Sequence, residues 1–147
     1  MSGDPRWAWA EVDLGAVRHN VAHLRRLVAP AAVWAVVKAD AYGHGATAVA
    51  RAAIDGGAEG LCVALVSEGV ALRQDGIDVP ILLLSEQPPD LAAQIVAHRL
   101  TPTIYTRQYL DALVREGPVG LGVHLKIDTG MQRVGAHPHA AVAIANS

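Results

Sequence analysis

A lysine closes the short apolar segment 33–38, and its position at the end of that segment suits it to covalent chemistry. The segment is compact and rich in valine, which is typical of a buried strand. Because side chains alternate faces along a strand, Lys38 shares its face with Trp34 and Val36, and the opposite face is entirely apolar. We expect the apolar face to pack against helices. Lys38 then points into a barrel at the C-terminal end of its strand, where such folds carry their chemistry.

A lysine in that position is costly unless it is paired or neutral, since desolvation disfavours its charged form. A neutral amine is what Schiff-base chemistry requires. The structural alternative is a lysine whose stem is buried and whose ammonium group stays in water. Gly43 and Gly45 favour the functional interpretation, because glycine lets the backbone approach a ligand closely. Tyr42 could donate a hydrogen bond to a phosphate held at the N-terminus of the following helix. The structural alternative is that Tyr42 is a half-buried aromatic residue of a loop.

A second group of polar side chains lies in the segment 123–135. By the same alternation His124, Lys126 and Asp128 face inward, and the apolar residues between them face the helices. Three polar side chains in a row on a buried face need partners. One interpretation is a structural ion pair between Lys126 and Asp128. The other places Lys126 and Arg133 beside a substrate carboxylate, which a guanidinium group matches with two parallel hydrogen bonds.

Other chemistries find little support in the sequence. His44 and His124 lie on different elements without a cysteine or histidine partner at ligand spacing, so we expect no metal site. No Ser-His-Asp pattern and no phosphate P-loop is present. Cys62 is the only cysteine and has apolar neighbours on both sides, so we expect it in the core. A single thiol forms no internal disulfide, which fits a reducing cytoplasm.

Strand and helix patterns alternate along the chain, and the strand starts recur roughly every 20 to 27 residues. Asp13, Ser67 and Thr106 are expected to cap helices. The predicted strands are 33–38, 60–65, 81–84, 101–105 and 119–127. The predicted helices are 14–28, 46–54, 67–73, a helix opened by Pro88 and Pro89, a helix after Thr106 that Gly117 and Pro118 end, and a helix from Pro138 onward.

This alternation predicts repeated right-handed βαβ units and a parallel sheet, either doubly wound or closed into a (β/α)8 barrel. No strand is followed by the G-x-G-x-x-G turn of a dinucleotide site, which favours the barrel. We therefore expect an α/β chain forming a partial (β/α)8 TIM barrel of about five βα units. The final helix has no stop signal, so we expect a longer protein, truncated before barrel closure.

The composition excludes several classes of protein. The chain has 147 residues, 52% hydrophobic and 18% charged, which supports one compact domain and argues against disorder. The net charge is −2 and the basic residues are scattered, so no nucleic-acid or anionic-membrane surface is expected. No apolar stretch approaches the roughly 20 residues of a membrane span, and the first residues lack the apolar core of a signal peptide. We expect a cytoplasmic protein.

Three blocks of the sequence, in order, resemble alanine racemases. Residues 35–45, Ala-Val-Val-Lys-Ala-Asp-Ala-Tyr-Gly-His-Gly, are similar to the pyridoxal-phosphate signature of that family. Residues 124–135 resemble its second conserved block, and residues 9–20 its opening, which related fold-type-III enzymes share in part. The resemblance implies that residues 1–147 are the N-terminal part of the cofactor-binding barrel domain, without the family's C-terminal β domain.

The resemblance also implies a role for each of four residues. Lys38 forms a Schiff base with pyridoxal 5′-phosphate and exchanges the α-proton on the D side, as one of two bases. Tyr42 helps to hold the cofactor phosphate. Arg133 contacts the phenolic oxygen of the cofactor and the carboxylate of the substrate. Lys126 matches a lysine that is often carbamylated in the family, and the negative charge of the carbamate orients Arg133.

The expected activity is that of an isomerase that interconverts L-alanine and D-alanine for peptidoglycan synthesis. The second base is a tyrosine from a second subunit, so we expect a homodimer of the full-length protein. That tyrosine and further cofactor ligands match no position in this sequence, so we expect the 147 residues alone to be inactive. The alternatives are a pyridoxal-phosphate carrier or homeostasis protein, a racemase for another amino acid such as serine, and a non-enzymatic scaffold module.

Overall fold

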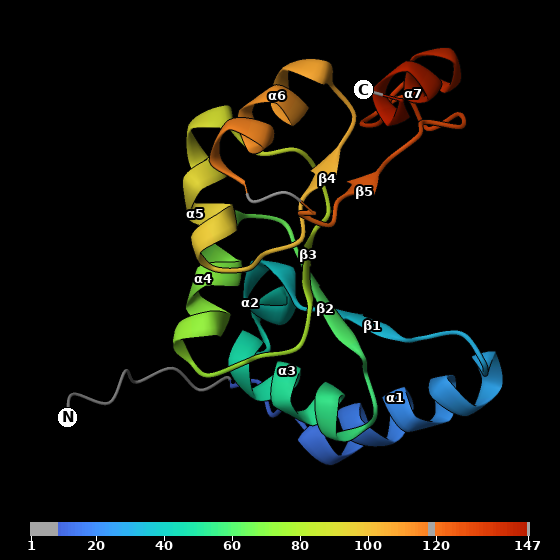
Figure 1. Ribbon diagram of the computed structural model, residues 1–147. Helices are drawn as coiled ribbons and strands as arrows, with labels where there is room; N and C mark the ends of the chain where they lie inside the picture. Colours follow the sequence, from blue (N-terminus) through green and yellow to red (C-terminus); the bar gives the residue numbers. More distant parts are fainter. Residues whose placement is uncertain (1–8, 118–119, 147) are drawn as a thin grey trace.

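The structure is a computed structural model that describes residues 9–117 and 120–146. Strands β1 (Trp34–Val36), β2 (Gly60–Val63) and β3 (Ile81–Leu83) form a parallel sheet in chain order. Strands β4 (Thr103–Ile104) and β5 (His124–Leu125) form a second parallel pair. An isolated parallel bridge between Leu82 and Thr101 joins the two groups. The described strands therefore follow one another in space in the order of the sequence (Figure 1).

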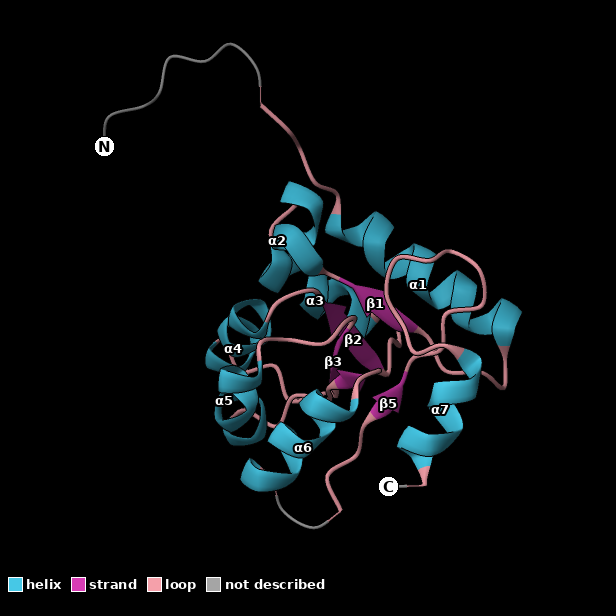
Figure 2. Cartoon of the chain, turned by 90° about the horizontal axis from the view of Figure 1, so that it is seen from above, coloured by secondary structure: helices cyan, strands magenta, loops and turns pink. Residues whose placement is uncertain are grey.

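The helices that connect these strands pack on the outer face of the curved sheet, and the inner face is open (Figure 2). A doubly wound sheet carries helices on both faces, whereas a barrel carries them on the outside only. The arrangement is therefore that of a partial (β/α)8 barrel, as the sequence predicts. The helical elements are α1 (Leu14–Val28), α2 (Lys38–Gly43), α3 (Ala46–Asp55), α4 (Val66–Gln74), the 3-10 turn η1 (Pro89–Leu91), α5 (Ala92–Ala97), α6 (Arg107–Glu116) and α7 (Pro138–Ala145).

The core lies between the outer face of the strands and these helices. Outward-facing residues such as Val37, Leu61 and Ile81 are almost completely buried against helix residues such as Leu72 and Ile95. The expected alternation of faces in the segment 33–38 is confirmed. Val33, Ala35 and Val37 pack into the core, whereas Val36, on the open face, is 41% exposed.

Two of the three predicted helix caps are confirmed. The Asp13 carboxylate accepts a hydrogen bond from the Ala16 N–H at 3.0 Å, and the Thr106 hydroxyl accepts one from the Tyr109 N–H at 3.2 Å. The prediction for Ser67 is wrong, because α4 begins one residue earlier, at Val66. Glu68, in the first turn of that helix, accepts the backbone N–H groups that precede it.

The fifth strand is shorter than predicted. It covers only His124–Leu125, and position 119 of the predicted segment lies outside the described residues. Gly120 and Gly122 precede it, and glycine weakens a strand because it offers no side chain to pack. Beyond the strand, Ile127 forms a parallel bridge with Ala136. No described helix is long and apolar enough to cross a membrane.

Candidate active site

Lys38 lies two residues after the end of β1 and begins a turn with an uncommon backbone. The Val37 N–H donates to the Cys62 carbonyl at 2.9 Å, which is the last bond of the β1–β2 ladder. From Ala39 to Tyr42, φ lies between 51° and 57° and ψ between 36° and 51°, so α2 is one turn of left-handed helix. Each non-glycine residue in that conformation costs roughly 1–2 kcal/mol. Strain of this kind persists only where surrounding contacts determine it, and it clusters at functional sites.

Several hydrogen bonds hold this turn. The Ala41 N–H donates to the Val37 carbonyl at 2.9 Å, and the Gly45 N–H donates to the Asp40 carbonyl at 3.0 Å. At the beginning of the turn, Oε1 of Glu68 accepts the Ala39 N–H at 2.7 Å. At its end, Nδ1 of His44 lies 2.8 Å from the Ala41 carbonyl, so this histidine has a local structural role.

The Asp40 carboxylate caps the next helix. Its Oδ1 accepts the Ala46 N–H, the first of α3, at 2.7 Å. A second anion close to this carboxylate meets like-charge repulsion. The expectation that the N-terminus of α3 holds a phosphate is therefore not supported. Within this segment, the predicted phosphate contact rests on Tyr42, whose side chain is 61% exposed.

Lys38 and Tyr42 lie close together, as their predicted roles require. The Lys38 Nζ sits 5.9 Å from the centre of the Tyr42 ring, a cation–π arrangement. The Lys38 side chain is half-buried, and within residues 9–117 and 120–146 it forms no ion pair with a carboxylate. An amine without a counter-charge is available for condensation with an aldehyde.

The side chains of Lys126, Asp128 and Arg133, the second group of predicted residues, form no hydrogen bonds with one another in the described part of the chain. The Lys126 Nζ donates to the Leu84 carbonyl at 3.2 Å, across the carboxyl ends of β3 and β5. Asp128 does not pair with Lys126. Its Oδ1 accepts the N–H groups of Gly130 at 2.9 Å and Gln132 at 3.1 Å, and these backbone hydrogen bonds hold the pKa of Asp128 below its usual range. The contact with Leu84 and the turn that Asp128 organises stand in place of the structural ion pair, which is one of the two interpretations of the sequence.

Arg133 follows the turn that Asp128 organises, and its side chain is exposed. No hydrogen bond or ion pair joins it to Lys38 or Lys126 in the described part of the chain. The chain therefore places Lys38 and Tyr42 together and Lys126 beside β3. It leaves Arg133 free for a ligand.

Two aromatic rings lie near each other at the amino end of the open face. The rings of Trp34 and His124 lie 6.2 Å apart at an angle of 48°, which links β1 with β5. Trp34 also lies against Gly60, where a Cβ atom would fall 2.5 Å from the indole ring. His124 thus packs against an indole rather than facing a ligand. The predicted chemistry lies at the opposite, carboxyl end, as in barrel enzymes generally.

Three residues that join the loops at this end have no role in the sequence predictions. Glu68 connects the exits of β1 and β2, because it also accepts the Ala64 N–H at 2.8 Å and the Leu65 N–H at 3.0 Å. Glu86 accepts the N–H groups of Tyr105 and Thr106 and so connects the exits of β3 and β4. Gln87, which is buried, donates to the Ala64 carbonyl at 3.0 Å. Their shared signal is a long polar side chain within five residues after a strand.

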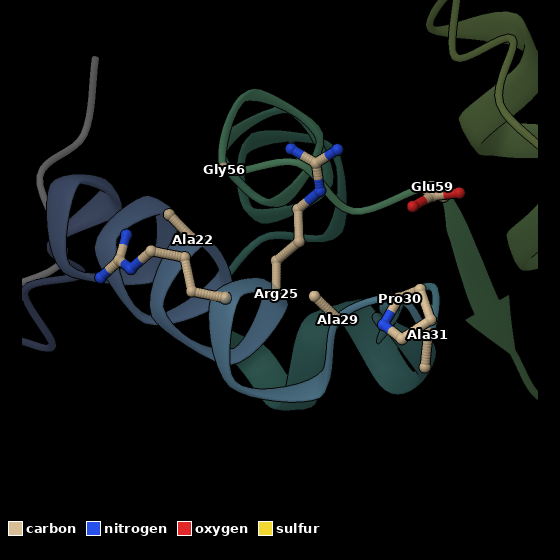
Figure 3. A pocket seen from close by; sticks show the side chains of 8 residues that line it. Ala22, Arg25, Ala29, Pro30, Ala31, Gly56 and Glu59 are labelled. Atoms are coloured by element: carbon tan, nitrogen blue, oxygen red, sulfur yellow. The ribbon is translucent and has the colours of Figure 1, made fainter.

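A pocket of about 380 Å³ lies beside Glu59, at the amino end of β2, whereas Lys38 lies at the carboxyl end of β1. It is formed where α1 and α3 end, and Arg25 extends across it toward Gly56 (Figure 3). The aliphatic part of Arg25 also packs against Gly57, 2.8 Å from where a Cβ atom would stand. In barrels this amino-terminal end serves stability rather than chemistry.

Comparison with known proteins identifies what this arrangement is similar to. A family model described as "Alanine racemase, N-terminal domain" matches residues 12–147. An alanine racemase of Desulfovibrio desulfuricans is 42% identical over 142 residues, which is 94% of this chain and 38% of that protein. The crystal structure of the alanine racemase from E. faecalis superposes with a TM-score of 0.83 at 40% identity, covering 92% of this chain and 39% of that one.

A histidine racemase from Leuconostoc mesenteroides has the same fold, with a TM-score of 0.79 at 27% identity over 90% of this chain and 38% of that one. The fold of this segment is thus shared by racemases named for different amino acids. The chain spans less than two fifths of the length of the Desulfovibrio relative.

Proposed function

The chain belongs to the alanine racemase family, and on that premise we propose that it is the cofactor-binding part of a racemase that interconverts L-alanine and D-alanine. The observation that carries the proposal is Lys38, a half-buried amine without an ion-pair partner in the described residues, at the carboxyl end of β1 and held against Tyr42 by a strained turn. In this proposal residues 1–147 form the first part of the barrel domain of the enzyme.

The residues at this end of the sheet suit pyridoxal 5′-phosphate. An aldehyde cofactor needs a free primary amine, and the Lys38 Nζ has no carboxylate partner in the described residues. Tyr42 places an exposed phenol beside that amine as a donor for the cofactor phosphate. When bound, pyridoxal phosphate withdraws electrons from the α-carbon of an amino acid and stabilises negative charge there.

The chain contributes an acid–base group and a carboxylate-binding group. Lys38 is the base on the D side: it would remove the α-proton of D-alanine, and in the other direction it would deliver a proton to that face as D-alanine forms. The Arg133 guanidinium would bind the substrate carboxylate and would contact the phenolic oxygen of the cofactor. Lys126 is the candidate for carbamylation, which would turn a cation held at the Leu84 carbonyl into an anion able to orient Arg133.

Inversion needs a second acid–base group on the opposite face of the α-carbon. We place it on a second subunit, so the active form of the full-length protein is a homodimer. We place the protein in the cytoplasm, where its product supplies peptidoglycan synthesis.

Two other functions are tested by the same experiment. A pyridoxal-phosphate carrier would bind the cofactor on Lys38 without converting an amino acid. A racemase for another amino acid is the second alternative, because a histidine racemase shares this fold. The full reading frame that encodes this chain is expressed and incubated separately with L-alanine, L-serine and L-histidine, and the D-enantiomers are measured.

We expect D-alanine to form fastest, and we expect Lys38→Ala to abolish its formation. Cofactor binding without any D-amino acid would establish the carrier instead, and faster formation of D-serine or D-histidine would reassign the substrate. The 147-residue chain by itself is expected to bind the cofactor without turnover.

A further inference from the structure

The left-handed turn that follows Lys38 is tied at its start to a neighbouring loop by one carboxylate. We propose that Glu68 is the positioning residue for Lys38: its carboxylate holds the amide next to the lysine and fixes the direction in which the lysine side chain leaves β1. This inference rests on the proposed function for the role of Lys38, but its structural part stands on hydrogen bonds of the described chain.

The two carboxylate oxygens of Glu68 bind different strand ends. Oε1 accepts the Ala39 N–H at 2.7 Å, at the exit of β1. Oε2 accepts the N–H groups of Ala64 at 2.8 Å and Leu65 at 3.0 Å, at the exit of β2. One side chain therefore sets the position of the β1 exit relative to the β2 exit. Ala39 is also the first residue of the strained turn, with φ of 51°.

Packing fixes the middle of the turn, where Ala41 is almost completely buried in the core, but it does not fix the first residue, because Ala39 is exposed. A groove of about 330 Å³ lies beside the turn, and its lining includes Val37, Asp40, Glu68 and Leu72. Ala39 itself is exposed, so its hydrogen bond to Glu68 is a contact that holds the first residue of the turn in the left-handed conformation. Without the bond from Ala39, the first residue is free to leave positive φ, and Lys38 and Tyr42 change direction with it.

Glu86 provides a matched control. It performs the same task one loop further along the barrel, where its carboxylate accepts the N–H groups of Tyr105 and Thr106 and the Thr106 hydroxyl. Both of those residues have ordinary φ values, and neither adjoins a lysine. If Glu68 only stabilises the fold, removing the charge of Glu68 and removing the charge of Glu86 should affect the reactivity of Lys38 equally.

The first measurement needs no cofactor. Amide hydrogen exchange is followed at Ala39 in the 147-residue chain and in the variants Glu68→Gln and Glu86→Gln. A glutamine side chain has one accepting oxygen, so it cannot bind both strand exits as the glutamate does. Loss of a hydrogen bond to a charged group predicts exchange at Ala39 roughly 10- to 100-fold faster in Glu68→Gln. No such change is expected in Glu86→Gln.

The second measurement connects the turn with the lysine. The chain is mixed with pyridoxal phosphate, and the rate of adduct formation on Lys38 is followed by borohydride reduction and mass spectrometry. We expect the rate to fall roughly tenfold in Glu68→Gln and to stay at the wild-type value in Glu86→Gln. Circular dichroism and thermal melting establish that both variants are folded; if Glu68→Gln is not, Glu68→Asp replaces it, with the same direction expected.

Equal behaviour of the Glu68 and Glu86 variants in both measurements would overturn the inference. A wild-type chain that forms no adduct on Lys38 would instead refute the proposed function, and the exchange measurement would still decide whether Glu68 holds the turn.

Discussion

Gly135 is the residue at which a single methyl group should most disturb the segment that carries Arg133. Its φ is 133°, and a Cβ atom there would lie 2.7 Å from the Asp128 nitrogen and 3.0 Å from the Ile127 carbonyl carbon. The close approach allows Asp128 to donate to the Ala136 carbonyl at 2.9 Å and Ala136 to donate to the Lys126 carbonyl at 2.8 Å. Gly135→Ala therefore meets both backbone strain and a backbone clash.

Two other glycines separate these effects. Gly130 has φ of 147° but open space around its Cβ position, whereas Gly122 has open space and no positive φ. Positive φ costs about 1–3 kcal/mol, and overpacking costs about a further 1–3 kcal/mol. We expect Gly122→Ala to change the free energy of unfolding by less than about 1 kcal/mol. Gly130→Ala should lower it by about 1–2 kcal/mol, and Gly135→Ala by about 3 kcal/mol or more.

Urea denaturation followed by circular dichroism measures the three free energies, and the melting temperature should fall by about 2–4 °C per kcal/mol. Equal destabilisation by Gly130→Ala and Gly135→Ala would refute the close contact between Gly135 and Asp128. The position of Arg133 would then need another structural cause.

Two further predictions concern stability. Arg73 donates to four backbone carbonyls, those of Ile77, Val79, His98 and Arg99. Arg73→Lys should therefore lower the free energy of unfolding by about 1–3 kcal/mol, measured by urea denaturation. The control is Arg99→Lys, because the ion pair of Arg99 with Asp78 is exposed, and an equal loss of stability in both variants would contradict this role of Arg73. Burial raises the pKa of Tyr109 to about 12 from its ordinary value of 10.0, so the stability linked to its protonated form is complete below pH 10 and is lost as the pH rises toward 12. Melting temperatures of the wild type and Tyr109→Phe between pH 9 and pH 12 should show a smaller decline in the variant, and parallel declines would exclude this group as the cause.

The sequence predicts those features of this chain that depend on near neighbours. Alternation along 33–38 correctly predicts that Val37 is buried and that Val36 lies on the other, more exposed face. Asp13 and Thr106 cap helices because each accepts an N–H three residues away. The order of strands agrees with the barrel prediction, because consecutive parallel strands of a barrel pair in sequence order.

Features that depend on distant residues are not predictable in this way. Nothing in Ala39 or Tyr42 favours positive φ, and the carboxylate that holds the turn stands 29 residues further along. The same separation hides the role of Glu86, which binds N–H groups 19 and 20 residues away. The prediction of Ser67 as a cap fails because α4 begins at Val66, whose N–H donates to Oε1 of Gln87, 21 residues further along, at 3.3 Å.

The chain contains only two lysines, Lys38 and Lys126, which makes the central claim directly measurable. The 147-residue chain is mixed with pyridoxal phosphate, reduced with borohydride and digested, and the modified lysine is identified by mass spectrometry. Our account predicts an adduct on Lys38 that persists in Lys126→Arg and disappears in Lys38→Arg. An adduct on Lys126 alone, or equal modification of both lysines, would contradict it.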